Sequence, residues 1–545
     1  MGKKLIKDPL YGYIEIEDKY ISIIDTAEFQ RLRNIRQTGY ASLYPSALHN
    51  RFVHSMGVFH LGKKAFTNFR KNVEEDFPSE KWKIWEETFV LACLLHDVGH
   101  SPFSHTAEEF YKLSTDFPQE LSKQIKCSEL DEDIHKQGYG KPHEAMSALV
   151  GHKLIKKSKV AFSFDDDLFV RAITGVTYEP AHNDSLILNI IIGMLNGSVI
   201  DVDKLDYLIR DSYVTGYSSM SIDVDRLLAG FTVSTYTTES NKSKMVPAYK
   251  KSALSIMENV AYANDLERRW IQNNPTILYD CKLVEIAIEQ YNEYMLHKYP
   301  KLSEYNNNVF NELAISKDGF PKESDIRLRL LSDDDIIQYL KNFDTSGIGY
   351  QYFSRDERLK PLWKSEAEFV ESVKSEMGSR ILRELRCSLH AITEPLRNGF
   401  FINETEYIRV SEELNRELSV PISERNAARI SNCMEVAKPY FILRQFANDY
   451  GLDFNFAVIY GNHFESNYKK LEVNDIFVEI GKNKVIKLGK TLAVKAIVAT
   501  EEEQQGLFYI YTSRVNIEKC REDDLNIAQL LVQYINGKWD EPLRE

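Results

Sequence analysis

Hydrophobic residues in the first half of the chain are spaced as in packed helices. Apolar side chains recur every three or four residues in Asp25–Arg36, His49–Phe69 and Trp85–Val98, which is the period of a helix with one buried face. The same spacing predicts helices within Ile190–Asp211 and Ser252–Tyr294. This part of the chain is therefore expected to form a helical core.

Strand-type segments interrupt and follow these helices. The Thr-, Ser- and Tyr-rich alternation of Val233–Lys251 predicts a short hairpin. Helical spacing returns in Asp325–Phe446 and in Asp523–Ile535, whose helix is expected to pack on a C-terminal sheet. Four short apolar runs predict the strands of that sheet: Phe454–Tyr460, Ile476–Ile480, Lys484–Leu488 and Leu507–Thr512. The fold class predicted is mainly α, with a helical core over residues 1–295 and an α+β lobe over residues 296–545.

One long segment within the core does not follow the helical pattern. Lys112–Lys141 is polar and weakly periodic, and it contains Gly138 and Gly140, which is typical of a surface excursion. The segment is expected to be either a lid over a site or an ordinary loop.

Composition restricts the class of protein. Of the 545 residues, 43% are hydrophobic and 27% charged, with 25 glycines and 16 prolines, so a collagen-like or disordered chain is excluded. The formal net charge of −13 disfavours a surface that coats nucleic acid or anionic lipid. The chain is expected to be globular.

The sequence contains no segment suited to export or to a membrane. Its longest apolar runs, Phe89–Leu95 and Leu186–Met194, are far shorter than the roughly 20 residues of a spanning helix. The N-terminal residues lack the features of a secretory signal. The six cysteines are scattered without a CxxC pair, which argues against a disulfide framework or a cysteine-based zinc site. A cytoplasmic location without membrane contact is expected.

Histidines mark the part of the chain that carries chemistry, since ten of the thirteen lie at or before His182. The apolar segment that starts at Phe89 ends in His96, Asp97 and His100, which lie within about one helical turn and can face one pocket. Burial of an imidazole beside a carboxylate is costly unless both are paired or bind a metal. The segment therefore predicts part of a metal site, whose other ligands come from elsewhere.

Two further helical segments can complete that site. Upstream, Arg51 and His54 are three residues apart on one helical face. Downstream, Asp203, Tyr207 and Asp211 follow one another at intervals of four, so a carboxylate can project from that helix. Two histidines and two aspartates form a mixed nitrogen and oxygen set that suits one divalent cation, Mn, Fe, Zn or Mg, with positions left for water and a phosphate oxygen.

The four ligand candidates resemble the metal set of a known family. His54, the His96-Asp97 pair and Asp203 have the H…HD…D order of the HD-domain phosphohydrolases. An HD dipeptide alone is common, whereas the complete ordered set is specific.

Longer segments narrow the resemblance. Thr26–Gly39, His49–Gly57 and Ile200–Asp211 resemble the SAM-and-HD-domain deoxynucleoside triphosphate triphosphohydrolases and their bacterial relatives. The similarity runs from Lys4 to Asp211 and more loosely to Tyr294, and no SAM domain is expected. It implies hydrolysis of a deoxynucleoside triphosphate at the α-phosphorus, with release of deoxynucleoside and intact triphosphate, and Mg²⁺ accompanying the nucleotide.

The resemblance also implies roles for other side chains. An acid-base cluster that protonates the leaving 5′-oxygen would consist of His105, His143 and Glu144. The triphosphate would be held by Arg51, His100, Lys204 and Tyr207. The sugar 3′-hydroxyl would be read by Gln37 and Asp211, and the sugar 2′-carbon would be covered by Tyr279.

Regulation by a nucleotide is a further implication of the resemblance. The family has a nucleotide-activated homotetramer, and the side chains here that match its activator pocket, which takes a (d)GTP-type nucleotide, are Lys4, Asp25, Gln30 and Arg33. A homo-oligomer, either dimer or tetramer, is therefore expected, with the lobe over residues 296–545 serving oligomerisation or regulation.

Other interpretations stay open. The chain could be an HD phosphohydrolase that acts on a nucleoside monophosphate, a ribonucleoside triphosphate, or a cyclic or alarmone-type nucleotide. It could also be a nucleotide sensor or a binder of single-stranded nucleic acid, although its charge makes nucleic acid a less favoured partner. The acid-base cluster could be a hydrogen-bonded loop network, and the N-terminal set could be ordinary capping and surface ion-pair residues.

Overall fold

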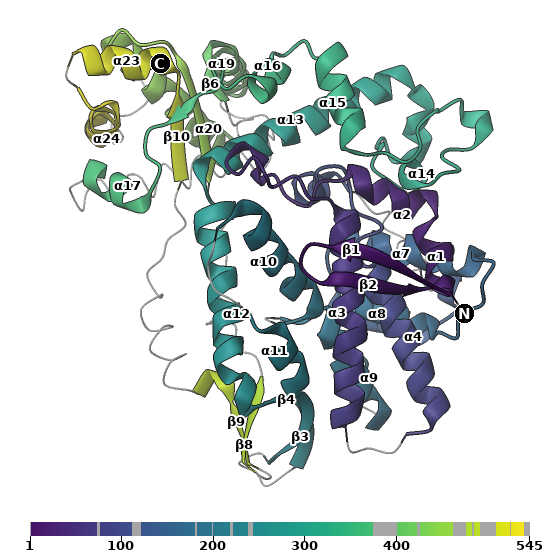
Figure 1. Ribbon diagram of the computed structural model, residues 1–545. Coiled ribbons are helices and arrows are strands. Elements are labelled where there is room, and N and C mark those ends of the chain that lie inside the picture. Colours follow the sequence, from purple (N-terminus) through teal and green to yellow (C-terminus); the bar gives the residue numbers. More distant parts are fainter. Residues whose placement is uncertain are drawn as a thin grey trace. The chain divides into compact units, whose positions relative to one another are not determined.

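The chain forms two compact units, which are described separately. The first comprises Met1–Ile271, Ala287–Phe343 and Phe464–Gln504, and the second comprises Gln272–Ile286, Asp344–His463 and Gln505–Glu545. This computed structural model (Figure 1) describes residues 2–73, 77–111, 121, 123–179, 183–198, 200–217, 222–237, 243–373, 401–421, 426–460, 476–481, 484–490, 508–523 and 525–538.

Helices make up most of the first unit, as predicted. They are α1 (Asp18–Ile24), α2 (Ala27–Arg31), α3 (Arg51–Asn72), α4 (Ser79–Leu95), α6 (Ser128–Gln137), α7 (Pro142–Lys157), α8 (Asp166–Thr174), α9 (Asn183–Leu195), α10 (Val202–Thr215), α11 (Val224–Gly230), α12 (Leu254–Leu266), α14 (Glu312–Ile315) and α15 (Asp333–Asn342). A π-helical turn over Glu267–Gln272 follows α12, and α13 (Pro275–Lys298) continues from the second unit into the first.

The helical spacing of the sequence produces a continuous hydrophobic core. α3 and α4 pack against each other, with α8 and α9 next to them (Figure 1). Phe59 and Phe66 of α3 and Phe89 of α4 are completely buried, and the rings of Phe66 and Phe89 lie 5.8 Å apart. Each fully buried aromatic side chain contributes roughly 2–3 kcal/mol through removal of apolar surface from water. This packing gives the two helices a fixed relative position from which to present polar residues.

Among the described residues, two small sheets belong to the first unit. Strands β1 (Lys3–Asp8) and β2 (Gly12–Glu17) form an antiparallel hairpin. The predicted hairpin near Val233 is present as β3 (Phe231–Thr237) and β4 (Ser243–Lys250). It continues into a four-stranded sheet of order β3-β4-β8-β9, with β8 (Phe477–Gly481) and β9 (Lys484–Lys487).

The position of β8 and β9 corrects the sequence interpretation, which placed all four C-terminal strands in one sheet of the lobe. β8 pairs in parallel with β4, with Ala248 opposite Phe477, and both side chains are fully buried. The local spacing of apolar residues predicted these two strands. It could not predict their sheet, because their neighbour β4 is far away in the chain and is selected by hydrophobic burial in the folded core.

The second unit combines helices with a second four-stranded sheet of order β5-β10-β7-β6. Its strands are β5 (Lys360–Pro361), β6 (Phe401–Asn403), β7 (Asn455–Tyr460) and β10 (Phe508–Thr512). Its helices are α16 (Ile348–Phe353), α17 (Glu366–Val373), α19 (Glu404–Ser419), α20 (Ala427–Asp449), α23 (Arg514–Glu522) and α24 (Ile527–Lys538). The lobe is thus α+β, as predicted.

Several predicted helices are shorter than the spacing indicated. Asp25–Arg36 contains only α2 and a short 3-10 turn, because Thr26 caps a new helix. The segment Ile190–Asp211 is divided between α9 and α10, since Asp201 caps the second helix. Of the predicted excursion Lys112–Lys141, the residues 112–120 and 122 lie outside the described part and the remainder includes α6. The division at residue 295 stays a prediction.

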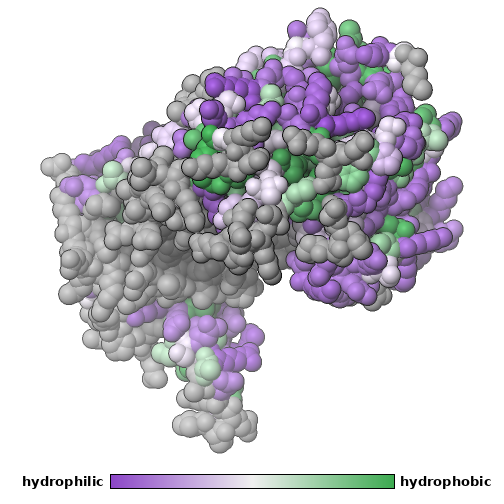
Figure 2. All heavy atoms as spheres, turned by 90° about the horizontal axis from the view of Figure 1, so that it is seen from below, coloured by the Kyte–Doolittle hydropathy of each residue, from purple (hydrophilic) through white to green (hydrophobic). Residues whose placement is uncertain are grey.

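The face of the molecule seen in Figure 2 is mostly polar where it is coloured. Hydrophilic side chains cover most of the coloured surface in Figure 2, with hydrophobic residues in smaller groups between them. Among the described helices, none combines the length and the apolar character needed to cross a lipid bilayer.

A buried charge network supports α8. Arg171 is fully buried, and its Nε lies 2.9 Å from Asp167 while its Nη2 lies 2.8 Å from Asp133. Nη1 donates a hydrogen bond to the Thr177 carbonyl at 3.0 Å. Loss of the cation would leave two carboxylates without their partner, which is more costly than loss of an exposed ion pair.

Replacement of Arg171 by alanine is therefore expected to lower the free energy of unfolding by about 3–5 kcal/mol. The matched control is Lys136→Ala, because the Lys136–Glu179 pair is exposed and its atoms are 3.5 Å apart, so a change of less than about 1 kcal/mol is expected. Urea unfolding measures both. Equal effects of the two variants would contradict this account of the Arg171 network.

Candidate active site

The first turn of α3 brings two polar side chains into the interior. Asn50 caps the helix by accepting a hydrogen bond from the Val53 amide at 3.2 Å. Arg51 and His54, three residues apart, therefore project from one face, and they are 3% and 0% exposed. The helix presents a guanidinium and an imidazole to one buried space.

The end of α4 supplies the next polar side chains. After Leu95 the chain turns through His96, Asp97 and His100, all of which are buried. Gly99 allows this turn to lie against α7, because a Cβ atom at Gly99 would be 2.3 Å from the Ser147 amide nitrogen. The adjacent histidine and aspartate are thereby held below the surface, where they require partners.

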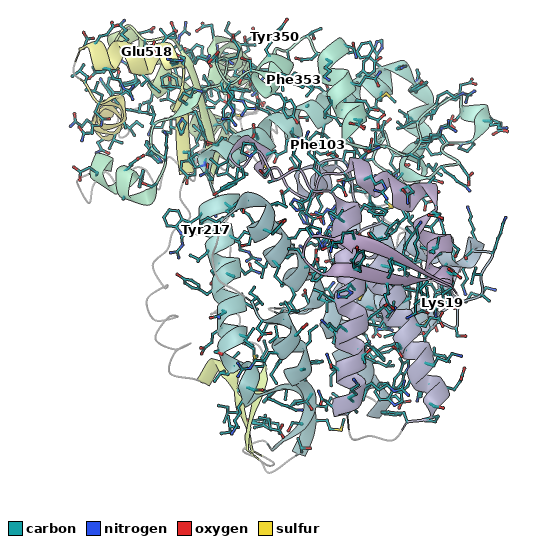
Figure 3. The ribbon with its side chains drawn as sticks, viewed as in Figure 1. Lys19, Phe103, Tyr217, Tyr350, Phe353 and Glu518 are labelled. Carbon is teal, nitrogen blue, oxygen red and sulfur yellow. The ribbon has the colours of Figure 1, made fainter. Side chains whose placement is uncertain are left out.

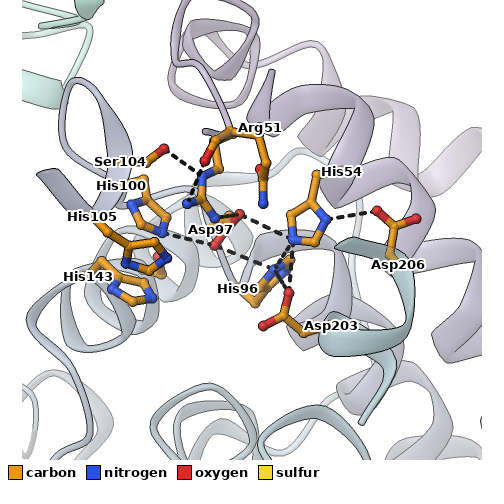
Figure 4. Close-up of polar contacts among 12 residues, drawn as sticks. Arg51, His54, His96, Asp97, His100, Ser104, His105, His143, Asp203 and Asp206 are labelled. Atoms are coloured by element: carbon orange, nitrogen blue, oxygen red, sulfur yellow. Dashed lines mark hydrogen bonds and ion pairs between the residues drawn. The ribbon is translucent and has the colours of Figure 1, made fainter. Parts of the chain in front are cut away.

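The first turn of α10 completes the cluster (Figure 4). Asp203 Oδ1 lies 2.9 Å from His54 Nε2 and 3.6 Å from His96 Nε2. The two Nε2 atoms are 3.3 Å apart. Ligand-type atoms of these three residues all lie within 4.8 Å of one another. Three elements that are distant in the sequence thus converge, in the arrangement that the metal prediction requires.

Asp97, the fourth predicted ligand, borders this cluster. Its Oδ1 lies 3.5 Å from His96 Nε2, and its Oδ2 lies 3.6 Å from His54 Nε2. Arg51 Nη1 donates to Oδ2 at 2.7 Å. Burial disfavours a charged carboxylate, but the Arg51 guanidinium holds the pKa of Asp97 well below its usual range. Asp97 is therefore an ionised carboxylate.

Hydrogen bonds on the outer sides of the imidazoles decide which nitrogens face the centre. His54 Nδ1 donates to Asp206 Oδ2 at 2.8 Å, and His96 Nδ1 donates to the Cys93 carbonyl at 2.9 Å. Each Nε2 atom is thus directed toward the other and toward Asp203. Converging imidazole nitrogens and carboxylate oxygens, with the imidazoles held from behind, are what a divalent cation needs. The residues fit such an ion.

A proton and a cation compete for this place. Burial disfavours a charged His54 imidazole, but hydrogen bonds to Asp203 and Asp206 raise the pKa of His54 to about 10. The atom that faces Asp203 Oδ1, at 2.9 Å, is Nε2. A cation bound by the same atoms would displace the proton, so metal binding and proton release would be coupled.

A second histidine cluster lies beside the first. The His100 ring stacks on the His143 ring with centroids 4.0 Å apart, and the His105 ring is 5.1 Å from both. Glu108 accepts from His105 Nδ1 at 2.9 Å and from His143 Nδ1 at 2.7 Å. Burial opposes its ionisation, but these two hydrogen bonds lower the pKa of Glu108 well below its usual value. These bonds leave Nε2 of His105 and of His143 as the ring nitrogens that are not engaged by Glu108.

Glu144 has a different contact from the expected one. It occupies the third position of α7, where its Oε2 accepts a hydrogen bond from the Lys141 amide at 2.8 Å, as glutamates at this position commonly do. The carboxylate that the structure places on His105 and His143 is Glu108 instead. The catalytic role of Glu144 stays a prediction.

A strained turn brings His105 and Glu108 to the site. They belong to the 3-10 segment Ser104–Phe110, which Phe103 (Figure 3) and Ser104 enter with φ angles of 55° and 56°, a region that side chains other than glycine rarely adopt. Asp333 accepts from the Phe103 amide at 2.6 Å and from the Arg36 amide at 3.0 Å. This buried carboxylate holds the turn in place.

Buried polar atoms occur in residues predicted to read the sugar and in His100, which is predicted to hold the triphosphate. Gln37 Oε1 and His100 Nδ1 are buried, and neither has a hydrogen-bond partner among the described residues. Asp211 Oδ1 lies 2.8 Å from His49 Nε2. Arg51 Nη2 donates to the Gln37 carbonyl at 3.5 Å. A buried polar atom without a partner suggests a ligand that satisfies it.

The other predicted triphosphate ligands already have protein partners. Lys204 Nζ donates to Asp201 Oδ2 at 2.5 Å and to the Gly197 carbonyl at 2.8 Å. The Tyr207 hydroxyl accepts from Asn264 Nδ2 at 2.9 Å. To contact a phosphate, the Lys204 ammonium would have to give up its hydrogen bonds to Asp201 and to the Gly197 carbonyl.

The remaining predicted residues make other contacts. Tyr279 belongs to the second unit, where its hydroxyl donates to Gln351 at 2.5 Å. Arg33 Nε donates to Gln30 Oε1 at 2.8 Å, and the Arg33 guanidinium lies 3.7 Å from the Phe52 ring centroid.

The other two members of the regulatory set are exposed. Lys4 lies in β1, and Asp25 directly follows α1. The sugar role of Tyr279 and the regulatory roles of the N-terminal set stay predictions.

The sequence analysis did not predict three carboxylates that lie near the site. Glu108 follows His105 by three residues, and Asp206 follows Asp203 by three, so helical spacing could have indicated both. Asp333 is more than 200 residues from the turn that it holds, and no local signal marks it.

Comparisons with known proteins bear on the family that the sequence resembles. No family model matches the chain. The resemblance to the HD-domain phosphohydrolases is nevertheless confirmed by homologues. The coarse class that they support is a phosphohydrolase.

Individual relatives are partial matches. The deoxynucleoside triphosphate triphosphohydrolase SAMHD1 homolog of Dictyostelium discoideum is 33% identical over 232 residues, which are 42% of this chain and 39% of that protein. An HD domain-containing protein of Acanthamoeba polyphaga mimivirus is 32% identical over 225 residues, 38% of this chain and 42% of the other. The chain thus matches less than half the length of these relatives.

Among solved structures, a phosphohydrolase from Bacteroides thetaiotaomicron has a similar fold. Its TM-score is 0.54 at 17% identity, and the match covers 94% of this chain and all of the other. This likeness concerns the fold alone.

Proposed function

We propose that this protein is a metal-dependent deoxynucleoside triphosphate triphosphohydrolase, which converts a deoxynucleoside triphosphate and water into a deoxynucleoside and triphosphate. The observation that carries the proposal is the convergence of His54, His96 and Asp203 next to the Glu108-linked histidines. Similarity to the Dictyostelium protein, whose name states this activity, supports the substrate class.

The cation would be held by His54, His96, Asp97 and Asp203, in the buried cluster where their ligand atoms meet. Mn²⁺, Fe²⁺, Mg²⁺ or Zn²⁺ would suit the donor set. When bound, such an ion offsets the charge of phosphate oxygens and lowers the pKa of water, so that water attacks phosphorus at neutral pH.

Proton transfer to the leaving group would fall to His105 and His143. Glu108 accepts the Nδ1 protons of both, which leaves Nε2 of each ring free to hold a proton for the departing 5′-oxygen. A positioned imidazole of this kind typically contributes about 10²–10⁴-fold to the rate. Glu144 would belong to the same acid-base cluster, and Glu108 would keep both rings oriented.

Positive and polar side chains around the cation would bind the rest of the substrate. Arg51 is buried beside Asp97, where a guanidinium stabilises developing charge on phosphate oxygens. His100, Lys204 and Tyr207 would add contacts to the triphosphate. The side-chain carbonyl oxygen of Gln37, which has no partner among the described residues, would accept a hydrogen bond from the sugar 3′-hydroxyl. Asp211 would contact the same hydroxyl, and Tyr279 would cover the sugar.

Regulation forms part of the same proposal. Lys4, Asp25, Gln30 and Arg33 would bind a guanine nucleotide, and the stacked Arg33 guanidinium and the Gln30 amide supply groups that suit a base. The working form would be a homo-oligomer, a dimer or a tetramer.

Product analysis is the direct test. Purified protein incubated with each deoxynucleoside or ribonucleoside triphosphate, alone and in mixtures, with Mg²⁺ or Mn²⁺, is expected to release nucleoside and intact triphosphate, resolved by chromatography. Activity that appears only in mixtures would support the regulatory pocket. Orthophosphate or pyrophosphate as product would favour a different HD phosphohydrolase. Tight oligonucleotide binding without turnover would favour a nucleic-acid binder.

A further inference from the structure

The N-terminal hairpin reaches the metal cluster through a buried carboxylate. Tyr11 lies in the turn between β1 and β2, and its hydroxyl donates to Asp206 Oδ1 at 2.8 Å. Asp8, the last residue of β1, accepts from the Leu10 and Tyr11 amides at 2.8 and 3.1 Å. These bonds close the turn in the shape that directs the Tyr11 hydroxyl to Asp206.

Arg210 ties the same turn to α10. Its Nε and Nη2 atoms each lie 2.9 Å from an oxygen of Asp206, and its Nη1 lies 3.1 Å from Asp8 Oδ2. Asp206 and Arg210 are 0% and 2% exposed. A bidentate ion pair between a guanidinium and a carboxylate has a fixed geometry. The hairpin and α10 are therefore joined by a rigid contact.

The other side of Asp206 holds a proposed metal ligand. Asp206 Oδ2 accepts from His54 Nδ1 at 2.8 Å, which aims His54 Nε2 at Asp203. Each oxygen of Asp206 therefore has two donors: Tyr11 and Arg210 on Oδ1, His54 and Arg210 on Oδ2. A carboxylate saturated in this way has no freedom to move without disturbing the ring of His54.

The helix that carries His54 leaves room for this carboxylate. Gly57 is three residues after His54 on the same face of α3. A Cβ atom there would be 1.9 Å from Asp206 Oδ1 and 2.6 Å from Arg210 Nη2. Glycine at this position allows the Asp206–Arg210 pair to lie directly against the first turns of α3.

We propose that Tyr11 and Asp8 are positioning residues of the metal centre, so that docking of the N-terminal hairpin and binding of the cation reinforce each other through Asp206. The inference takes from the proposed function only the assumption that His54, His96, Asp97 and Asp203 bind a cation. Linkage is reciprocal: if the docked hairpin strengthens cation binding by a given factor, the cation stabilises the docked hairpin by the same factor. A ligand that displaces the hairpin would thereby weaken the metal centre.

Tyr11→Phe is the cleanest test, since it removes one hydroxyl and keeps the ring. Mn²⁺ titration calorimetry on the full chain, at a temperature where both metal-free proteins are folded, is expected to show affinity reduced about fivefold. The control is Tyr13→Phe on the same hairpin, whose side chain is 61% exposed and whose affinity should equal that of the wild type. Asp8→Asn, which weakens the Arg210 contact, is a second variant that should also reduce affinity.

Hydrogen exchange measures the reciprocal effect. Amides of residues 3–17 should exchange more slowly when Mn²⁺ is added to the wild type, and this protection should shrink in Tyr11→Phe but not in Tyr13→Phe. If the wild type binds Mn²⁺ and Tyr11→Phe, Asp8→Asn and Tyr13→Phe all bind it equally well, the coupling is overturned while the proposed function survives. If the wild type binds none of Mn²⁺, Fe²⁺, Mg²⁺ and Zn²⁺, both fail.

Discussion

Replacement of Asp203 by alanine is expected to abolish both metal binding and nucleotide hydrolysis. Asp203 Oδ1 is the atom closest to His54 Nε2 in the cluster, at 2.9 Å, and its loss would leave two imidazoles with only Asp97 as a carboxylate ligand. We expect the metal content to fall to background and turnover to fall by at least ~10³-fold, because the cation supplies both the charge and the activated water. Elemental analysis and the product assay measure the two quantities.

Asp225→Ala is the matched control for this prediction. Asp225 lies in α11, its side chain is 73% exposed and its contact is with Lys64, so metal content and turnover should match the wild type. Full activity of Asp203→Ala would remove that residue from the mechanism. Metal retained without turnover would instead assign Asp203 to catalysis rather than to metal binding.

The segments of the metal cluster could be predicted because each is local. Arg51 and His54 share a face through their separation of three residues, and the cap at Asn50 fixes where that face begins. His96 and Asp97 end an apolar helix, where burial makes them need partners. What local spacing could not supply was the assembly of these segments, and the resemblance to a known family supplied it.

The acid-base cluster shows where such reasoning stops. Glu144 is next to His143 in the sequence, yet adjacent residues of a helix point in different directions, and its position in α7 turns the side chain back to the Lys141 amide. Glu108 reaches both histidines only because the preceding turn has positive φ angles. A left-handed turn at a phenylalanine cannot be predicted from local propensity.

The pairing of strands that are far apart in the chain could not be predicted from the pattern of apolar residues either. The strand character of Phe477–Gly481 was visible in its apolar residues, but its parallel partner is β4, more than 200 residues earlier. Likewise Asp333, the first residue of the distant helix α15, accepts from the amides of Arg36 and Phe103. Such contacts depend on the assembled core, which selects among many segments of equal local preference.

Glu108→Gln is expected to lower the turnover number by about 10²–10⁴-fold while metal content is unchanged. Glutamine preserves the shape of the side chain but removes the charge, and its amide nitrogen cannot accept a proton from a histidine Nδ1. One of the bonds to His105 and His143, at 2.9 and 2.7 Å, would therefore be lost, and that ring would be free to rotate or to change tautomer. Steady-state kinetics with elemental analysis on the same preparation measure both.

Glu144→Gln separates the two candidate carboxylates. Because Glu144 contacts the Lys141 amide, we expect its loss to act on the start of α7, with an effect on turnover much smaller than that of Glu108→Gln. Glu129→Gln, an exposed glutamate of α6, serves as the neutral control for both. A larger loss of turnover in Glu144→Gln than in Glu108→Gln would make Glu144 the carboxylate of the acid-base cluster. Glu144 would then have to give up its hydrogen bond with the Lys141 amide in order to act with the two histidines.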